Sequence, residues 1–180
     1  IRHAVKNFRT GAHIFGLRVQ NPSQYGIVLL DDAQQPIGLV EKPTRPQSNY
    51  AVPGFYIFDS SCVFFSQTLQ KSNRGELEII DLLNKYLKNK KLDLTLLSRG
   101  TGWIDAGTHE NHAIVSRYVE AMQQMHGILF GSPHEAALIR GFIDEALLQQ
   151  FSEPMPDSSY KAYLVGLTNL SQKSRQTTSI

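Results

Sequence analysis

The sequence predicts an α/β fold in which a mixed sheet with flanking helices is followed by a helical region. Short apolar segments bounded by turn-forming residues fill much of the first half of the chain, as strands do. Segments with helical periodicity lie between and after them, and beyond residue 127 only helical patterns remain. We therefore expect a sheet-containing domain over residues 1–127 and a helical appendage over residues 128–170.

The predicted strands are separated by sequences that favour turns. Gln20-Asn-Pro-Ser23 follows the first strand, and Asp31-Asp-Ala-Gln-Gln-Pro36 would join the second and third as a hairpin. In the fourth strand, Pro53 and Gly54 would disturb a regular ladder, and Gly54 would let the backbone approach a ligand closely. The expected strands are residues 12–19, 25–31, 36–41, 50–58 and 92–97.

Helical periodicity predicts the remaining elements. Residues 76–88 place Leu77, Ile80, Leu83 and Leu87 on one face. Ser132-Pro-His-Glu135 combines a capping serine, a proline in the first turn and a glutamate that reaches back. The expected helices are residues 61–70, 76–88, 108–125, 133–140, 144–151 and 158–166. Residues 171–180 carry too little apolar surface to pack, so we expect a disordered tail there.

Composition and charge exclude several classes of protein. The 180 residues include 41% hydrophobic residues, enough for a domain with its own core, and the net charge of +2 is mild. The cluster Lys85, Lys88, Lys90 and Lys91 reads as a solvated face, so we expect no nucleic-acid partner. We expect no membrane partner and a cytoplasmic location, because no run reaches membrane length and no leader pattern opens the chain.

A few polar residues could carry chemistry, although each is ordinary alone. Glu41 and Lys42 end a strand and would point to opposite faces if it stayed regular, and alone they read as a surface ion pair. Arg74 precedes a predicted helix start, where free amides and a guanidinium could converge on a phosphate, but it could equally be a solvated loop residue. Asp105 is typical of a turn, yet one carboxylate with substrate phosphates can hold Mg²⁺.

Other reaction classes lack their motifs. The sequence contains no G-x-S-x-G or H-E-x-x-H motif, and its histidines are not spaced as metal ligands. The single cysteine, Cys62, lies in an apolar stretch and reads as a buried, inert thiol. These observations exclude serine hydrolases of that type, zinc proteases and internal disulfides.

Taken together and in order, the clusters resemble the second half of the glucose-1-phosphate thymidylyltransferase family, over the chain up to about residue 166. Related sugar nucleotidyltransferases share Glu-Lys-Pro but rarely the Ser-Asn-Tyr-Ala-Val and Arg-Gly-Glu-Leu-Glu sequences. The matching segments are Gln24-Tyr-Gly26, Val40-Glu-Lys-Pro43, Ser48-Asn-Tyr-Ala-Val-Pro-Gly-Phe-Tyr56, Arg74-Gly-Glu-Leu-Glu78 and Trp103-Ile-Asp-Ala-Gly-Thr108.

The resemblance implies an enzyme that converts glucose 1-phosphate and dTTP to dTDP-glucose and pyrophosphate, for deoxysugars of the dTDP-rhamnose type and surface polysaccharides. It implies a mostly parallel, Rossmann-like sheet of the nucleotidyltransferase type, a Mg²⁺ cofactor and a homo-oligomer, which is a tetramer in the family. Residues 1–127 would be the sugar-phosphate-binding part of the nucleotidyltransferase domain.

The resemblance also implies roles for single residues. Lys42 and Arg74 would be catalytic residues that hold the sugar phosphate, and Asp105 would be one magnesium ligand. The residues implied to bind substrate are Tyr25, Gly26, Glu41, Lys42, Val52, Gly54, Tyr56, Arg74 and Trp103. We expect Glu41, Lys42, Tyr56, Arg74 and Asp105 to converge on one cleft at the strand ends.

The sequence also departs from the family pattern. The family's glycine-rich loop, G-x-G-T-R-L, and its other metal-binding aspartate are absent, so we expect a sheet incomplete at its amino-terminal side, with an exposed apolar edge. Ile80 replaces a usual threonine, and Ile139 stands where an arginine linked to a regulatory nucleotide site is frequent. Two alternatives stay open: a non-catalytic sugar-phosphate-binding or oligomerisation remnant, and a transferase of this fold that uses UTP or another nucleotide.

Overall fold

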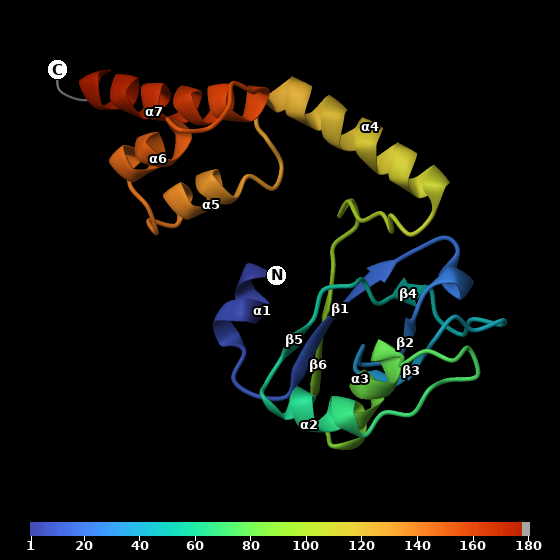
Figure 1. The fold of residues 1–180 in the computed structure, drawn as a ribbon. Coiled ribbons are helices and arrows are strands. Elements are labelled where there is room, and N and C mark those ends of the chain that lie inside the picture. The colour runs from blue at the N-terminus through green and yellow to red at the C-terminus, as the bar shows by residue number, and fades with distance from the viewer. Residues whose placement is uncertain (178–180) are drawn as a thin grey trace. The chain divides into compact units, whose positions relative to one another are not determined.

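The computed structural model describes the backbone of residues 1–177 and the side chains of residues 1–168. Two compact units make up the chain, Ile1–Trp103 and Ile104–Ile180, and each is described by itself (Figure 1). The first unit contains α1 (Arg2–Asn7), β1 (Ala12–Arg18), η1 (Pro22–Gln24), β2 (Ile27–Leu30), β3 (Pro36–Val40), β4 (Tyr50–Ala51), β5 (Ile57–Phe58), α2 (Ser61–Gln67), α3 (Ile79–Lys88) and β6 (Leu92–Leu96). Neither α1 nor η1 was predicted.

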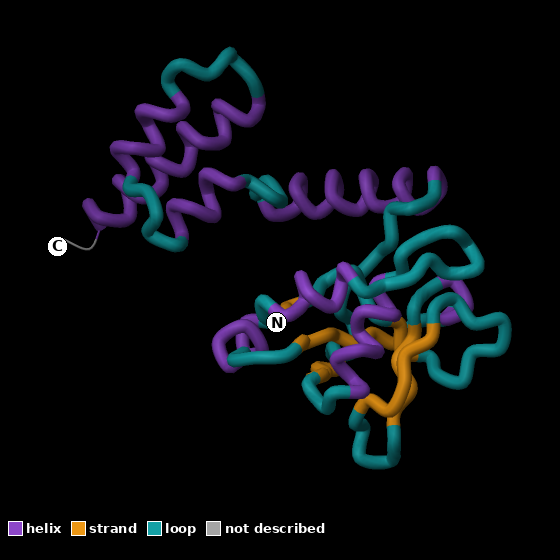
Figure 2. Tube along the Cα trace, turned by 60° about the horizontal axis from the view of Figure 1, so that its bottom comes forward, coloured by secondary structure: helices purple, strands orange, loops and turns teal. Residues whose placement is uncertain are grey.

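The sheet of the first unit is mixed but mostly antiparallel, so the expected mostly parallel sheet is wrong for the described strands. Its order is β3-β2-β4-β1-β5, and β6 pairs with β1. The strands of this unit are orange in Figure 2. Only β1 and β6 run parallel within residues 1–177, in register from Ala12↔Leu92 to Gly16↔Leu96. The reason lies in the connections: a tight turn joins β2 to β3, and only antiparallel strands can be joined in that way.

The predicted strand 50–58 is broken into β4 and β5, both antiparallel to β1. Ala51 pairs with Leu17 and Ile57 pairs with His13, so residues 52–56 lie opposite only residues 14–16. Pro53 has no N–H to donate within this segment. The Val52 N–H instead donates to the Gly26 carbonyl (2.8 Å), which draws the broken segment toward β2.

The core of the first unit lies between the sheet and α3. Its buried members from the sheet side are Ala12, Ile14, Val28, Leu39, Val52 and Leu92, and those from α3 are Ile80, Leu82, Leu83 and Tyr86. Leu77, predicted to share the buried helix face, is 58% exposed, because Glu78 is extended and α3 begins only at Ile79. The apolar helical period was therefore predicted correctly from Ile80 onward.

Asp59 ties together three segments of the first unit. Its carboxylate accepts hydrogen bonds from the Gly11 N–H (2.6 Å) and the Thr10 hydroxyl (2.8 Å) before β1, and from the Tyr86 hydroxyl (2.9 Å) of α3. It also accepts from the N–H (3.0 Å) and the hydroxyl of Ser61, at the start of α2. These donors, the Ser61 hydroxyl first and the Gly11 N–H next, hold the pKa of Asp59 well below its ordinary value.

The expected exposed apolar edge is found on β3. Among the described strands β3 pairs only with β2, and Ile37 (61%) and Val40 (39%) are exposed. Both β5 and β6 pair only with β1, but the apolar residues Ile57 and Phe58 of β5 and Leu94 and Leu96 of β6 are half-buried. Among these three strands, the exposed apolar residues therefore lie on β3.

The second unit is helical, with α4 (His109–His126), α5 (Pro133–Ile139), α6 (Glu145–Ser152) and α7 (Ser159–Thr177). Side chains cap all four of these helices, since Thr108, Ser132, Asp144 and Ser158 accept from N–H groups in the first turn. The predicted boundary at residue 127 falls at the end of α4, which terminates at left-handed Gly127 (φ 63°). The second unit already begins at Ile104, so α4 belongs with the helices that follow it and not with residues 1–103.

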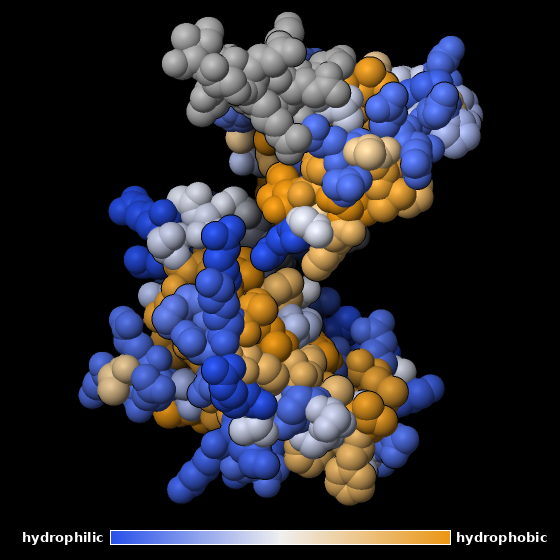
Figure 3. Space-filling model, turned by 90° about the vertical axis from the view of Figure 1, so that its left-hand side faces the viewer, coloured by the Kyte–Doolittle hydropathy of each residue, from blue (hydrophilic) through white to orange (hydrophobic). Residues whose placement is uncertain are grey.

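Two further features of the second unit differ from expectation or add to it. The helix α7 continues to Thr177, past its predicted end at residue 166, and residues 178–180 of the expected disordered tail lie outside the described residues. Leu148 and Leu164 are fully buried in the second unit, whereas the side chains of Ile139 and Phe142 are 74% and 80% exposed. Apolar residues at the surface are orange in Figure 3. Within residues 1–177 no helix is both long and apolar enough for a membrane span.

Candidate functional site

The end of β3 and the loop before α3 meet in a cluster of charged side chains. Arg74 lies at its centre: its Nη1 is 3.4 Å from Glu41 Oε1 and 3.6 Å from Glu78 Oε1, and its Nη2 is 3.0 Å from Glu76 Oε2. Glu41 and Arg74 are 33 residues apart in sequence. The structure thus brings together two residues that the sequence had singled out separately.

Lys42 joins this cluster because the backbone turns directly after β3. The strand ends at Val40, and Lys42 has a left-handed backbone (φ 38°), which is uncommon for a residue other than glycine. Its N–H donates to the Tyr25 carbonyl (3.1 Å), and its Nζ lies 3.9 Å from Glu41 Oε1. Glu41 and Lys42 therefore do not point to opposite faces, as a regular strand would require, but reach the same place.

The loop that carries Arg74 is closed by Ser72 and Glu78. The Ser72 hydroxyl donates to Glu78 Oε1 (2.7 Å) and accepts from the Arg74 N–H (3.2 Å). The Gly75 N–H donates to the Ser72 carbonyl (2.8 Å), and Gly75 has the positive φ of 80° that such a turn requires. Because α3 begins at Ile79 with Glu78 before it, the expected meeting of Arg74 with the free amides of a helix start is not formed.

Uncharged residues of β2 and the β4–β5 segment lie beside the cluster. A Cβ added to Gly26 would lie 2.6 Å from Ile80 Cδ1 and 3.0 Å from Glu41 Oε2, so these three residues are in close contact. Burial raises the pKa of Tyr56, and the negative charge of Glu41 raises it further. Gly26, Glu41, Lys42, Val52 and Arg74 are therefore linked by direct contacts within the first unit, and the charge of Glu41 acts on Tyr56.

Two aromatic residues stand next to this site. The rings of Tyr25 and Trp103 meet edge to face with centroids 5.1 Å apart, and the Tyr25 carbonyl is the partner of Lys42. Gly54 has open space around it, since a Cβ built there would meet nothing within 4 Å. Its predicted role, to let a ligand approach the backbone, stays a prediction.

Asp105, the predicted magnesium ligand, belongs to the second unit. Its Oδ1 accepts the Gly107 N–H (3.1 Å), the local turn that an aspartate before glycine favours. No three His, Cys, Asp or Glu side chains come together as metal ligands in the part of the chain that the structure describes. The convergence of Asp105 with Glu41, Lys42, Tyr56 and Arg74 stays a prediction.

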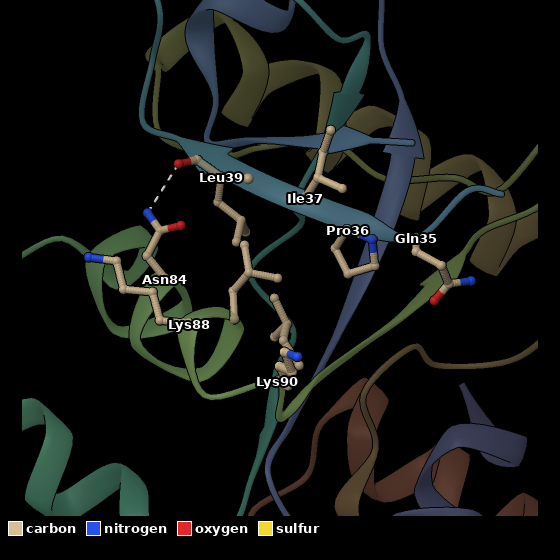
Figure 4. Close-up of a pocket in the computed structure, with 10 residues that line it drawn as sticks. Gln35, Pro36, Ile37, Leu39, Asn84, Lys88 and Lys90 are labelled. Carbon is tan, nitrogen blue, oxygen red and sulfur yellow. Dashed lines mark hydrogen bonds between the residues drawn. The ribbon is translucent and has the colours of Figure 1, made fainter. Parts of the chain in front are cut away.

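Three residues of the cluster, Ser72, Glu76 and Glu78, were not among the predicted site residues. The signal for the two glutamates was present in Arg74-Gly-Glu-Leu-Glu78, where carboxylates on both sides of an apolar residue follow an arginine, whereas Ser72 lies outside this segment. A separate groove lies between β3 and α3, where Asn84 Nδ2 donates to the Leu39 carbonyl (3.1 Å) and Lys88 and Lys90 stand at the rim (Figure 4). None of the predicted site residues lines this groove.

The chain is similar to known sugar nucleotidyltransferases. Residues 1–122 match the family model described as Nucleotidyl transferase. The chain is 44% identical over 158 residues to a glucose-1-phosphate thymidylyltransferase of Actinoplanes sp., covering 88% of this chain and 52% of that protein. It is 36% identical over 166 residues to one of Mycobacterium tuberculosis, covering 91% and 58%.

A solved structure agrees with these relatives. A Bacillus anthracis protein in complex with sucrose, described as a candidate glucose-1-phosphate thymidylyltransferase, superposes with a TM-score of 0.59 at 33% identity, covering 73% of this chain and 50% of that one. The chain thus spans about half the length of the relatives it matches.

Proposed function

Because the chain belongs to the nucleotidyl transferase family, we propose that it is the carboxyl-terminal, sugar-phosphate-binding part of a glucose-1-phosphate thymidylyltransferase. The observation that carries this proposal is the meeting of Glu41 and Arg74, which joins the end of β3 to the loop before α3 beside Gly26 and Tyr56. A sugar phosphate needs this combination of cationic groups for its phosphate and acceptor groups for its hydroxyls.

The residues of the site divide into two roles. Lys42 and Arg74 hold the phosphate of glucose 1-phosphate, since ammonium and guanidinium groups form charge-assisted hydrogen bonds with phosphate oxygens. Glu41 accepts hydrogen bonds from the sugar, while Gly26 and Tyr56 form the wall beside it. Tyr25 and Trp103 supply an aromatic surface next to Lys42.

The reaction requires two anions to be aligned. An oxygen of glucose 1-phosphate attacks the α-phosphorus of dTTP and pyrophosphate leaves, so positioning and charge neutralisation account for most of the catalysis. Lys42 and Arg74 carry out the positioning of the sugar phosphate. We take dTTP as the nucleotide from the curated relatives, and UTP is the alternative to be compared with it.

Asp105 suits one position in a shared magnesium site. Its carboxylate is exposed and has one N–H partner at 3.1 Å, which leaves oxygen lone pairs for a hard cation. Mg²⁺ is often bound through one or two carboxylates together with substrate phosphates, so a lone carboxylate fits such a site. When bound, the ion neutralises charge on the transferring phosphates. We further propose a cytoplasmic homo-oligomer that supplies nucleotide sugars for deoxysugar and polysaccharide synthesis.

Calorimetric titration with glucose 1-phosphate tests the binding role. Lys42→Ala should weaken binding about tenfold to a hundredfold, because a hydrogen bond to a charged group contributes roughly 1.5–3 kcal/mol. Lys88→Ala is the matched control, since it removes the same charge from the far end of α3, at the groove. Unchanged binding in Lys42→Ala, or an equal loss in Lys88→Ala, would contradict the proposed site.

Asp105→Asn separates the metal role from the binding role. We expect glucose 1-phosphate binding to stay nearly intact. In the completed enzyme, in which the chain is joined to a nucleotide-binding half, dTTP-dependent turnover should fall and require more magnesium. The measurement is the steady-state rate across a magnesium series, with dTTP and UTP compared. Loss of sugar-phosphate binding equal to that of Lys42→Ala would show that the two roles are wrongly assigned. Binding without any turnover in the completed enzyme would favour a non-catalytic sugar-phosphate-binding protein.

A further inference from the structure

We propose that Glu76 is the resting counter-ion of Arg74, and that the phosphate of an incoming sugar phosphate replaces it while Glu41 and Glu78 keep their hold on the guanidinium. The inference rests on the proposed function of this site, and it adds a carboxylate that competes with the substrate. Glu76 would then keep Arg74 extended and closed to weakly bound anions until a phosphate arrives.

The carboxylates around Arg74 differ in burial and in the nitrogen that they contact. Nη1 faces Glu41 (3.4 Å) and Glu78 (3.6 Å), whose side chains are 23% and 11% exposed. Nη2 faces Glu76 at 3.0 Å, and this side chain is 61% exposed. Nη2 of the Arg74 guanidinium is therefore paired with Glu76, the most exposed of the three carboxylates.

Glu78 is fixed in place and Glu76 is not. The Ser72 hydroxyl donates to Glu78 Oε1 (2.7 Å), and the same hydroxyl accepts the Arg74 N–H (3.2 Å), so displacing Glu78 would open the loop. The side chain of Glu76 forms its ion pair with Arg74 and no second ion pair among residues 1–168. Its backbone carbonyl still accepts from the Ser72 N–H (2.8 Å), so the side chain can swing away without moving the loop.

Charge and energetics favour this exchange. Glu41, Glu76 and Glu78 outnumber Lys42 and Arg74 by one charge, so a phosphate entering the intact cluster meets an excess of carboxylate. Release of Glu76 removes that excess. An exposed ion pair changes an equilibrium by a factor of only about 1.4 to 5, whereas a phosphate oxygen paired with a guanidinium fork forms one of the stronger hydrogen bonds in proteins.

Two substitutions of opposite sign test the inference, with binding of glucose 1-phosphate and of inorganic phosphate followed by NMR titration. Glu76→Gln should tighten binding about twofold to fivefold, because it removes the competitor. Glu78→Gln removes the same charge but also weakens the closure through Ser72 that positions Arg74, so binding should weaken more than about fivefold. Glu153→Gln, an equal charge change at an exposed residue of the second unit, should leave binding unchanged.

A double-mutant cycle shows whether Glu76 acts through Arg74. In an Arg74→Ala background, Glu76→Gln should no longer tighten binding. Equal tightening with and without Arg74, or no tightening by Glu76→Gln in the wild-type background, would overturn the inference. The proposed function would still stand in that case if the wild-type protein binds glucose 1-phosphate. The predicted pattern with inorganic phosphate, without a preference for glucose 1-phosphate, would support the inference and contradict the proposed function. If neither probe binds to any variant, both fail.

Discussion

Substitution of Gly26 by alanine tests the packing between the sheet and the site. The added Cβ would lie 2.6 Å from Ile80 Cδ1, 2.8 Å from Ile80 Cγ1 and 3.0 Å from Glu41 Oε2, where carbon atoms normally approach to about 3.5–4.0 Å. Glu41 can rotate toward water. Ile80 cannot, because it is 2% exposed and packed in the core. Gly26→Ala should therefore force a shift of α3, a change of the Ile80 rotamer, or both.

The expected cost is that of overpacking a core, a loss of about 1–3 kcal/mol in the free energy of unfolding. Ile80→Val removes the atom that the new methyl group meets first, and alone it should cost about 0.5–1.5 kcal/mol. Together the two changes should cost less than the sum of their separate effects, by roughly 1 kcal/mol, because each relieves the strain that the other creates.

The assay is urea unfolding followed by the fluorescence of Trp103, the only tryptophan, whose ring lies 5.1 Å from that of Tyr25. Gly54→Ala is the control, since a Cβ there meets nothing within 4 Å and should change stability by less than about 0.5 kcal/mol. Wild-type stability in Gly26→Ala, an equal loss in Gly54→Ala, or simple additivity with Ile80→Val would refute the reasoning.

Two further predictions concern pH. Because hydrogen bonds hold the pKa of Asp59 below its unfolded value of about 3.9, its stabilisation is complete above that pH and is lost as the pH falls through the acid range. Asp59→Asn should lower stability at pH 7 and flatten the acid loss in urea unfolding between about pH 5 and pH 2, and an unchanged acid profile would contradict this role. Burial lowers the pKa of His13 from its ordinary value of about 6.5, although the negative charge of Asp93 acts in the opposite direction. The neutral imidazole therefore stabilises the fold above about pH 6.5, and this stabilisation is lost as the pH falls from there toward the pKa of the folded state. His13→Gln, which can keep the bond to Thr95 (2.8 Å), should flatten the stability change between about pH 7 and pH 5; a folded pKa at or above 6.5 in an NMR titration would show the opposite sign.

Local sequence patterns predicted most of the elements. The strand predicted at 12–19 is β1 (Ala12–Arg18), and the helix predicted at 108–125 is α4 (His109–His126). The capping role of Ser132 is confirmed by its bond from the Glu135 N–H (3.2 Å). Alternation and capping arise from residues a few positions apart, so they can be read along the chain.

The errors occur where neighbours in space outweigh neighbours in sequence. The direction of the strands depends on which partners they find, and the predicted strand 50–58 was broken at a pair, Pro53 and Gly54, whose effect on pairing depends on β1. Asp59 gave no signal, because its donors come from before β1, the start of α2 and the middle of α3. The unpredicted α1 buries only Ala4.

The candidate site shows the same division. The sequence by itself determined which chemical groups are available: a carboxylate and an ammonium at a strand end, an arginine before a helix, and glycine and tyrosine near them. Only the tertiary structure decided that Glu41 meets Arg74, that left-handed Lys42 turns toward the same carboxylate, and that buried Glu78 and exposed Glu76 hold different nitrogens of one guanidinium. The physical reason is that charge pairing and burial depend on distances across the fold, and these are set when α3 packs on the sheet.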